Sequence, residues 1–127
     1  MRFLFFAILF AVFPSEIHAK LPTTIIRDCY DGDTCTTIDG EKIRLACIDT
    51  PELKGKKAEP IAAKEARDFM NNLVSNEKVS IKRITTDKYG RTVAELFKNN
   101  INLQELVVKK GYGKIYKRYA FQCSWTQ

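Results

Sequence analysis

Two short polar stretches contain the residue types that phosphate chemistry requires. Residues 44–52 offer a guanidinium, two carboxylates and a threonine within nine positions. Residues 31–34 offer two more carboxylates, separated by a glycine. Carboxylate oxygens bind hard cations, and a guanidinium binds phosphate through two parallel hydrogen bonds. We therefore expect the two stretches to meet in space and to hold a hard cation beside a phosphate.

The histidine content narrows the chemistry. The only histidine, His18, lies in an N-terminal segment that we expect to be removed. The remaining chain then excludes Ser-His or Cys-His nucleophiles, paired-histidine ribonuclease chemistry and histidine-ligated zinc. Catalysis must use carboxylates, arginine, lysine, tyrosine or a metal held by oxygen.

Phosphodiester hydrolysis without histidine requires a metal that polarises the phosphate and neutralises its charge. Asp33, Asp49 and a backbone carbonyl are oxygen ligands suited to Ca²⁺ or Mg²⁺. With only two carboxylates, we expect weak binding and a preference for Ca²⁺, which tolerates irregular geometry. Glu52 is placed to orient or deprotonate the attacking water. Arg44 and Arg91 are suited to the charged equatorial oxygens, because a guanidinium fork matches phosphate geometry.

Taken singly, each of these residues has a structural interpretation. Residues 31–33 are compatible with a simple turn, and Asp49 with a loop cap before a proline. Arg44 is compatible with a surface position paired with Glu52. Their joint occurrence in one short domain favours the site.

The first nineteen residues are predicted to be a secretory signal peptide. Residues 3–13 are eleven consecutive apolar residues after a basic start, and Ala19 is a small residue suited to cleavage. The alternative is a membrane anchor, but a spanning helix needs about 20 apolar residues. We therefore expect one domain over residues 20–127, secreted or periplasmic, without stable membrane association after cleavage.

Charge and cysteine content suit an exported protein with a polyanionic partner. The net charge is +6, which favours nucleic acid, anionic lipid or acidic polysaccharide. Four cysteines allow three pairings. Cys29–Cys35 with Cys47–Cys123 is favoured, because the first two flank a tight turn, and free buried thiols are the alternative. No CxxC spacing occurs, which argues against a zinc site.

Five segments rich in β-branched or alternating apolar residues are predicted strands. They are residues 23–27, 34–38, 41–48, 78–84 and 91–97. Tight turns join the first three into a meander, and a turn at residues 87–90 joins the last two. A lysine-rich loop over residues 53–60 adjoins the polar cluster.

Two helices complete the pattern. One is predicted over residues 60–74, with a proline at its start and an apolar stripe. The other begins after a cap at Asn102, with Glu105 completing a capping box, and ends at Gly111. Three strands, a helix, two strands and a helix is the order of an OB-type barrel. We predict an α+β fold, a five-stranded OB-fold barrel with two helices and a truncated third.

The combined motifs resemble the staphylococcal nuclease (thermonuclease) family. The resemblance is carried by residues 31–34, 44–45, 48–52 and 87–91, and the 102–111 helix also matches. It covers roughly residues 23–119. It implies an OB-fold barrel with Ca²⁺-dependent phosphodiesterase activity on DNA and RNA, acting as an endonuclease and leaving 3′-phosphates. We expect a monomer.

The resemblance also implies a role for each matching position. The implied calcium ligands are Asp33, Asp49 and the carbonyl of Thr50. The implied catalytic residues are Glu52, as general base or water-positioning residue, with Arg44 and Arg91 as the phosphate-binding pair. The implied nucleotide-pocket residues are Lys88 and Tyr89, with Tyr116 or Tyr119 stacking on a base.

The chain departs from the family in its C-terminal region. The family usually continues with a full third helix, whereas here only residues 121–127 remain, and a Cys47–Cys123 bond would fasten them. Two other functions stay open. One is a catalytically weak or inactive nucleic-acid-binding OB module, and the other is a basic domain that binds lipid or polysaccharide. The intact set of carboxylates and arginines favours the enzyme.

Overall fold

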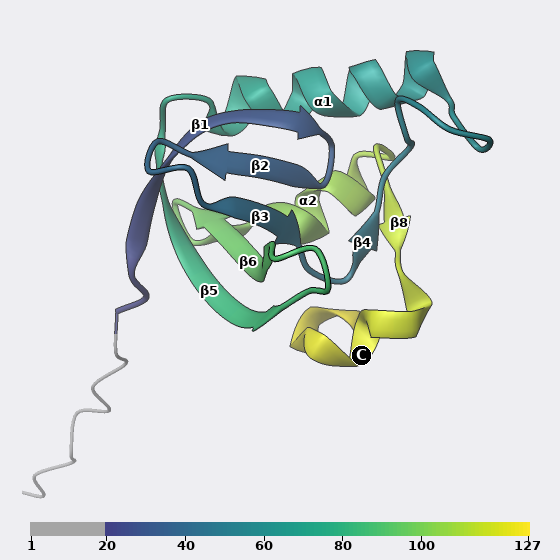
Figure 1. The fold of residues 1–127 in the computed structure, drawn as a ribbon. Helices are drawn as coiled ribbons and strands as arrows, with labels where there is room; N and C mark the ends of the chain where they lie inside the picture. The colour runs from purple at the N-terminus through teal and green to yellow at the C-terminus, as the bar shows by residue number, and fades with distance from the viewer. Residues whose placement is uncertain (1–19) are drawn as a thin grey trace, which may run out of the picture.

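The computed structural model describes residues 20–127, and its strands close into a five-stranded barrel (Figure 1). The barrel order is β1, β2, β3, β6 and β5, and β5 pairs back with β1. Their bounds are Thr23–Asp31 (β1), Thr34–Thr37 (β2), Lys42–Leu45 (β3), Lys78–Thr86 (β5) and Thr92–Lys98 (β6). The α+β OB-fold prediction is confirmed. The expected signal peptide, residues 1–19, lies outside the described residues.

The pairing that closes the barrel also gathers charged side chains. β3 and β6 run parallel, with Arg44 opposite Val93. Arg91 immediately precedes β6, so the two arginines come to the same end of the barrel. β2 pairs with β3 so that Thr34 faces Arg44, and the Leu45 N–H donates to the carbonyl of Asp33 at 2.8 Å. The acidic turn therefore lies beside the first arginine.

The predicted third strand, residues 41–48, is wrong in its second half. β3 ends at Leu45, and Cys47 adopts a left-handed conformation with φ 69°. The chain then turns out of the barrel as β4 (Ile48–Asp49), which pairs with β8 (Lys114–Ile115). Arg44 holds this turn by donating to the carbonyls of Leu45 at 2.7 Å and Ile48 at 2.9 Å. A local apolar alternation does not reveal such a break.

Helix α1 (Pro60–Val74) has the predicted bounds and lies along the barrel above β1 (Figure 1). The amide of Asn71 bonds both the N–H and the carbonyl of Cys29, at 2.7 and 3.0 Å. Gly32 is pressed between α1 and the β4 loop. A Cβ at Gly32 would lie 2.8 Å from Ala66 Cβ and 2.9 Å from the side chain of Thr50. Only glycine lets the acidic turn approach Thr50 this closely.

The second helix forms where predicted, with the Asn102 half of the expected capping box. The short strand β7 (Ile101–Asn102) leads into α2 (Leu103–Lys109), and Asn102 caps it by accepting the Glu105 N–H at 3.0 Å. Gly111 ends the helix with φ 83°. Buried Gln104 fastens α2 to β6 through the N–H and carbonyl of Leu96. The largest fully buried apolar side chains are Ile26, Ile43, Leu45, Ile48, Met70, Val74, Val79, Ile81, Leu96, Leu103 and Val107.

The C-terminal tail, residues 117–127, forms two short 3₁₀ helices. They are η1 (Lys117–Gln122) and η2 (Ser124–Thr126), in place of the α-helical start that the sequence suggested. Both favoured disulfides are present. Cys29–Cys35 joins directly opposed residues of β1 and β2, and Cys47–Cys123 joins the β3–β4 turn to the tail.

Removing the Cys47–Cys123 bond is expected to destabilise the protein more than removing Cys29–Cys35. The first closes a sequence separation of 76 residues and the second a separation of 6. In the chain-entropy treatment these loops correspond to about 4 and about 2 kcal/mol. Urea unfolding of Cys47→Ala/Cys123→Ala and Cys29→Ala/Cys35→Ala measures both. Reduction with dithiothreitol should also lower the melting temperature. An unchanged melting temperature would count against the presence of the disulfides.

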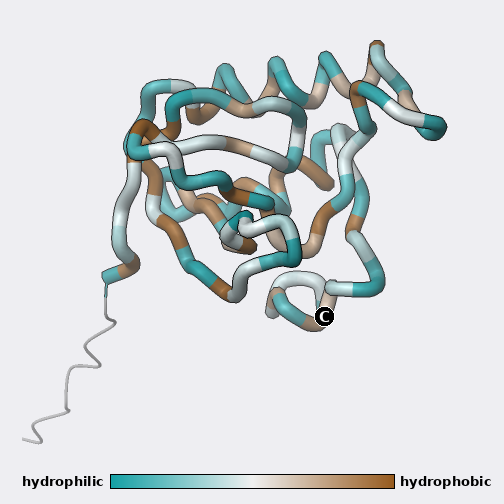
Figure 2. The backbone as a smooth tube through the Cα atoms, viewed as in Figure 1, coloured by the Kyte–Doolittle hydropathy of each residue, from teal (hydrophilic) through white to brown (hydrophobic). Residues whose placement is uncertain are grey.

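The surface beside β4 is strongly polar. The loop between β4 and α1 has a hydrophilic tip (Figure 2), which contains the exposed Lys54, Lys56 and Lys57. None of the helices in residues 20–127 has the length and apolar character needed to cross a bilayer. This basic loop is available to a polyanion near the charged end of the barrel.

Candidate nuclease site

The residues predicted to form the site surround one groove of about 1010 Å³. Eight of the nine predicted residues line it: Asp33, Arg44, Asp49, Glu52, Lys88, Tyr89, Arg91 and Tyr116. The ninth, Thr50, is buried and lines an adjoining pocket of about 360 Å³, which shares Asp49 and Glu52 with the groove. The fold thus brings together side chains that lie up to 83 positions apart in the sequence.

Asp33 is the buried centre of the acidic part of the groove. It is 6% exposed, and its Oδ2 accepts the Thr50 N–H at 3.1 Å. The same oxygen lies 3.4 Å from Arg44 Nη2, while Oδ1 accepts the Thr34 hydroxyl at 3.2 Å. A carboxylate has about four lone-pair sites, so Asp33 retains acceptor capacity. It links the acidic turn to the loop that carries Asp49.

Asp31 also belongs to this cluster, as expected for the acidic stretch 31–34, although it was not among the predicted metal ligands. Its Oδ1 accepts the Asp33 N–H at 3.1 Å. Burial, followed by the negative charge of Asp33, raises the pKa of Asp31 from its usual 3.8 to about 7, against a lowering effect of Arg44. Burial and the charge of Asp33 both disfavour the ionised form of Asp31, so a proton or a cation at this point is favourable. The Asp-Gly-Asp spacing was the available sequence signal.

These donors fit a hard cation. Asp33, Asp49 and the carbonyl of Thr50 supply only oxygen, and the negative charge of Asp33 is, after burial, the second cause that raises the pKa of Asp31. The described residues contain no group of three or more His, Cys, Asp or Glu side chains arranged around one metal position. A metal bound here would therefore take part of its coordination from backbone, water or substrate oxygen.

The Arg44 guanidinium is held by part of its N–H donors, and its other donors are free within residues 20–127. Its guanidinium donates to the carbonyls of Leu45 and Ile48 and lies beside Asp33. Its side chain is 17% exposed, so little rotamer freedom remains. A guanidinium has five N–H donors, which leaves donors for an anion in the groove. The orientation of Arg44 is fixed before any ligand binds.

Arg91 is held by Asp87, a residue that the sequence indicated only as part of a turn. Asp87 Oδ2 accepts a hydrogen bond from Arg91 Nε at 2.7 Å. Its Oδ1 accepts hydrogen bonds from the backbone N–H groups of Tyr89 and Arg91. Burial alone would raise the pKa of Asp87, but these hydrogen bonds lower it below its usual value. The two Nη atoms of Arg91 stay available. The four-residue spacing of Asp87 and Arg91 was the signal for this pair.

Aromatic and basic side chains border the groove on the β5–β6 turn and near the tail. Tyr89 is 72% exposed, and its ring lies 5.1 Å from Lys88 Nζ and 5.4 Å from the Arg91 guanidinium carbon. On the opposite segment, Tyr116 and Tyr119 contact edge to face at 5.3 Å. Exposed rings beside cations suit bases and phosphates of single strands.

Glu52 is the one exposed carboxylate at the mouth of the groove that has no side-chain partner among residues 20–127. Its backbone carbonyl accepts the Glu59 N–H at 2.9 Å, which holds the loop in place. The backbone of Glu52 is therefore held, while both carboxylate oxygens remain available to water.

The raised pKa of Asp31 predicts a pH-dependent stability. The folded state holds this proton more tightly than the unfolded chain. This contribution to the free energy of unfolding is therefore full below about pH 4 and is lost as the pH rises to about 7. Asp31→Asn removes it. Between pH 5 and pH 8 in EGTA, the melting temperature of the parent protein should therefore fall more than that of Asp31→Asn. Equal falls would contradict the shifted pKa.

The fold and the charged groove together define an OB-fold protein of the staphylococcal nuclease type. Residues 42–125 match the protein family described as staphylococcal nuclease homologue. The match covers well over half of the chain, and the chain belongs to the staphylococcal nuclease family. The resemblance inferred from the sequence motifs is confirmed.

Two of the three curated relatives described below have endonuclease or nuclease in their names. An uncharacterized endonuclease of Haemophilus influenzae is 36% identical over 103 residues, covering 76% of this chain and 54% of the relative. The Arabidopsis thaliana staphylococcal-like nuclease CAN1 is 35% identical over 78 residues, covering 61% of this chain and 23% of the relative. An uncharacterized Bacillus anthracis protein is 38% identical over 103 residues, covering 76% and 47%. The chain spans about half the length of the bacterial relatives it matches.

Proposed function

We propose that this protein is an exported, calcium-dependent nuclease that hydrolyses phosphodiester bonds of DNA and RNA. The observation that carries the proposal is the single groove lined by Asp33, Arg44, Asp49, Glu52 and Arg91. Membership of the staphylococcal nuclease family and the similarity to proteins named endonuclease and nuclease support it.

In this proposal Glu52 acts on water. Its carboxylate orients a water molecule for in-line attack on phosphorus and accepts its proton, while the leaving oxygen departs on the opposite side. The exposed position of Glu52 and the lack of a partner in the described chain support this role. Placing the water in the groove converts a bimolecular attack into a positioned one.

Arg44 and Arg91 bind the non-bridging oxygens as negative charge builds on them. Both guanidiniums are already fixed, Arg44 by two carbonyls and Asp33, and Arg91 by Asp87. Little reorganisation is then required when the charge develops, which is the main source of electrostatic catalysis. Arginine suits this role better than lysine because its fork binds two oxygens at once.

Asp33, Asp49 and the carbonyl of Thr50 would hold the calcium ion. When bound, Ca²⁺ would supply polarisation of the phosphate and neutralisation of its charge. The juxtaposition of Asp31 and Asp33, in which Asp31 Oδ1 accepts the Asp33 N–H, supports cation binding at this point. The small number of carboxylates supports a weak site.

The substrate class follows from the remaining lining residues. Lys88, Tyr89 and Tyr116 would contact the nucleotide by charge and stacking, and Lys54 and Lys57 line the same groove. Such contacts read phosphates and ring faces and do not depend on a 2′-hydroxyl, which supports action on both DNA and RNA.

Export rests on separate features. The predicted signal peptide over residues 1–19, the two disulfides and the net charge of +6 all support a secreted or periplasmic protein. We further propose that residues 20–127 are the mature domain and that it acts as a monomer without stable membrane association.

Digestion of single-stranded DNA with Ca²⁺ and with EGTA tests the proposal. We expect fragments carrying 3′-phosphates in Ca²⁺ and no cleavage in EGTA. Cleavage that persists in EGTA would contradict calcium dependence. Binding without cleavage under every metal condition would instead establish a non-catalytic OB module, the alternative that the sequence leaves open.

A further inference from the structure

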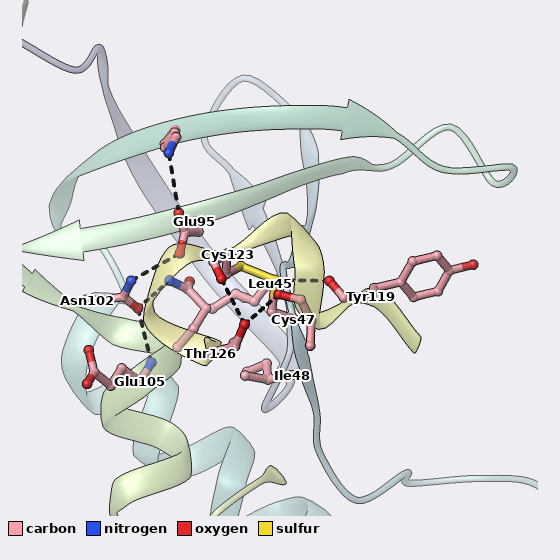
Figure 3. The surroundings of a disulfide bond; sticks show 12 residues. Leu45, Cys47, Ile48, Glu95, Asn102, Glu105, Tyr119, Cys123 and Thr126 are labelled. Atoms are coloured by element: carbon pink, nitrogen blue, oxygen red, sulfur yellow. Dashed lines mark hydrogen bonds and ion pairs between the residues drawn. A yellow bond between two sulfur atoms is a disulfide. The ribbon is translucent and has the colours of Figure 1, made fainter. Parts of the chain in front are cut away.

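The C-terminal tail is attached to the barrel at very few points. The side-chain hydrogen bonds of Thr126 and Gln127 both return to the carbonyls of Ala120 and Cys123, within the tail itself. Its contacts with the rest of the described chain include the Cys47–Cys123 disulfide (Figure 3) and packing of Trp125 on the core. The disulfide is therefore the covalent element that sets where the tail lies.

Cys47 is the common anchor for the tail and for the charged groove. Its carbonyl accepts the Tyr116 N–H at 2.8 Å, and its Sγ lies 3.4 Å from the carbonyl oxygen of Tyr119. The ring of Tyr119 points away from the disulfide (Figure 3). Cys47 also forms the left-handed turn that Arg44 holds between β3 and β4. One residue thus fixes the tail against the segment that carries the first arginine.

Arg118 is the cation that this arrangement places in the groove. Arg118, Tyr119 and Gln122 line it from the tail, and the Arg118 guanidinium carbon lies 5.4 Å from the Tyr119 ring centroid. Arg44 and Arg91 each face a carboxylate, whereas Arg118 forms no ion pair within residues 20–127. Its donors are therefore open to an anion. The adjacent Lys117 is exposed but does not line the groove.

We propose that Arg118 binds a phosphate of the nucleic-acid strand away from the bond that is cleaved, and that the Cys47–Cys123 disulfide positions it there. The proposal rests on the proposed function for the identity of the polyanion. The groove then presents three arginines to the strand, Arg44 and Arg91 from the barrel and Arg118 from the tail. An Arg–phosphate contact of this kind strengthens binding without reading sequence.

The charge contact is tested by comparing Arg118→Gln with Lys117→Gln, which removes the same charge one position away. Affinity for a fluorescent single-stranded oligonucleotide is measured by anisotropy in EGTA over a range of salt concentrations. Arg118→Gln should reduce the slope of log affinity against log salt by about 0.7, the value for one phosphate contact on single strands. In Ca²⁺ it should raise KM and leave kcat unchanged. Identical slopes for the two variants would overturn the proposal.

The positioning role of the disulfide is tested by a double-mutant cycle. In Cys47→Ala/Cys123→Ala, adding Arg118→Gln should no longer change the salt slope. In Cys29→Ala/Cys35→Ala, the matched control, it should change the slope as in the parent. A full Arg118 effect without the Cys47–Cys123 bond would overturn the positioning role. If the double variant is unfolded, Cys123→Ser alone at low temperature provides the same comparison.

These outcomes are separable from failure of the proposed function. Anisotropy in EGTA reports binding in the absence of cleavage. A protein that binds the oligonucleotide with an Arg118-dependent salt slope but never cleaves it would overturn the nuclease proposal and support the Arg118 contact. Normal cleavage with no effect of Arg118→Gln on the salt slope would support the nuclease proposal and overturn the Arg118 contact.

Discussion

Replacing Glu52 by glutamine is expected to slow cleavage of single-stranded DNA by about 10²–10⁴-fold, the usual contribution of a positioned general base. The amide keeps the shape of the side chain but cannot accept a proton. Glu52 is exposed and has no side-chain partner in the described chain, so folding should not suffer. Initial rates in Ca²⁺ measure the loss, and an unchanged thermal melting curve establishes that the fold is intact.

Glu59→Gln is the matched control for this experiment. Glu59 is an exposed glutamate at the other end of the same loop, and its N–H donates to the Glu52 carbonyl. It lines the adjoining pocket but not the main groove. Its substitution removes one negative charge at a similar place and should leave the rate near that of the parent. Equal rates for Glu52→Gln and the parent would remove Glu52 from the mechanism.

Local signals were sufficient for several elements of the fold. The bounds of α1 were predicted because its proline start and apolar stripe are contained in the helix. The cap at Asn102 and the C-terminal Gly111 were equally local. The break at Cys47 was not predictable in this way. Its left-handed conformation is supported by the Arg44 side chain and by a disulfide to residue 123, and neither is encoded in the alternation of residues 41–48.

The candidate site, like the fold, was predictable from the sequence only in part. Residue types and order identified the carboxylates and the arginines, but their meeting depends on the parallel pairing of β3 with β6, which joins segments nearly fifty positions apart. Asp87 looked like a turn residue because only the folded turn shows its carboxylate on Arg91. Arg118 was one of several basic residues near the C-terminus. Only the position of the disulfide-linked tail distinguishes it from Lys117.

Arg91→Lys is expected to lower kcat by about 10³-fold, within the range seen when a guanidinium that stabilises phosphoryl-transfer charge is lost. Lysine keeps the charge but presents a single ammonium, so it cannot bind two phosphate oxygens while also holding Asp87. KM should change much less, because the lost contact strengthens mainly in the transition state. Equal losses in binding and in kcat would contradict this role.

Asp87→Asn separates the orientation of Arg91 from its presence. The asparagine oxygen can still accept the backbone N–H groups of Tyr89 and Arg91, but its amide nitrogen would face Arg91 Nε, donor against donor. We therefore expect a smaller fall in kcat, of about 10-fold, since the guanidinium is present but no longer fixed. Arg83→Lys is the control, because Arg83 also pairs with a carboxylate, through two hydrogen bonds to Glu41, but does not line the groove. The cleavage rate of Arg83→Lys should match that of the parent. If Arg83→Lys lost as much activity as Arg91→Lys, the loss would reflect a general weakening of the barrel.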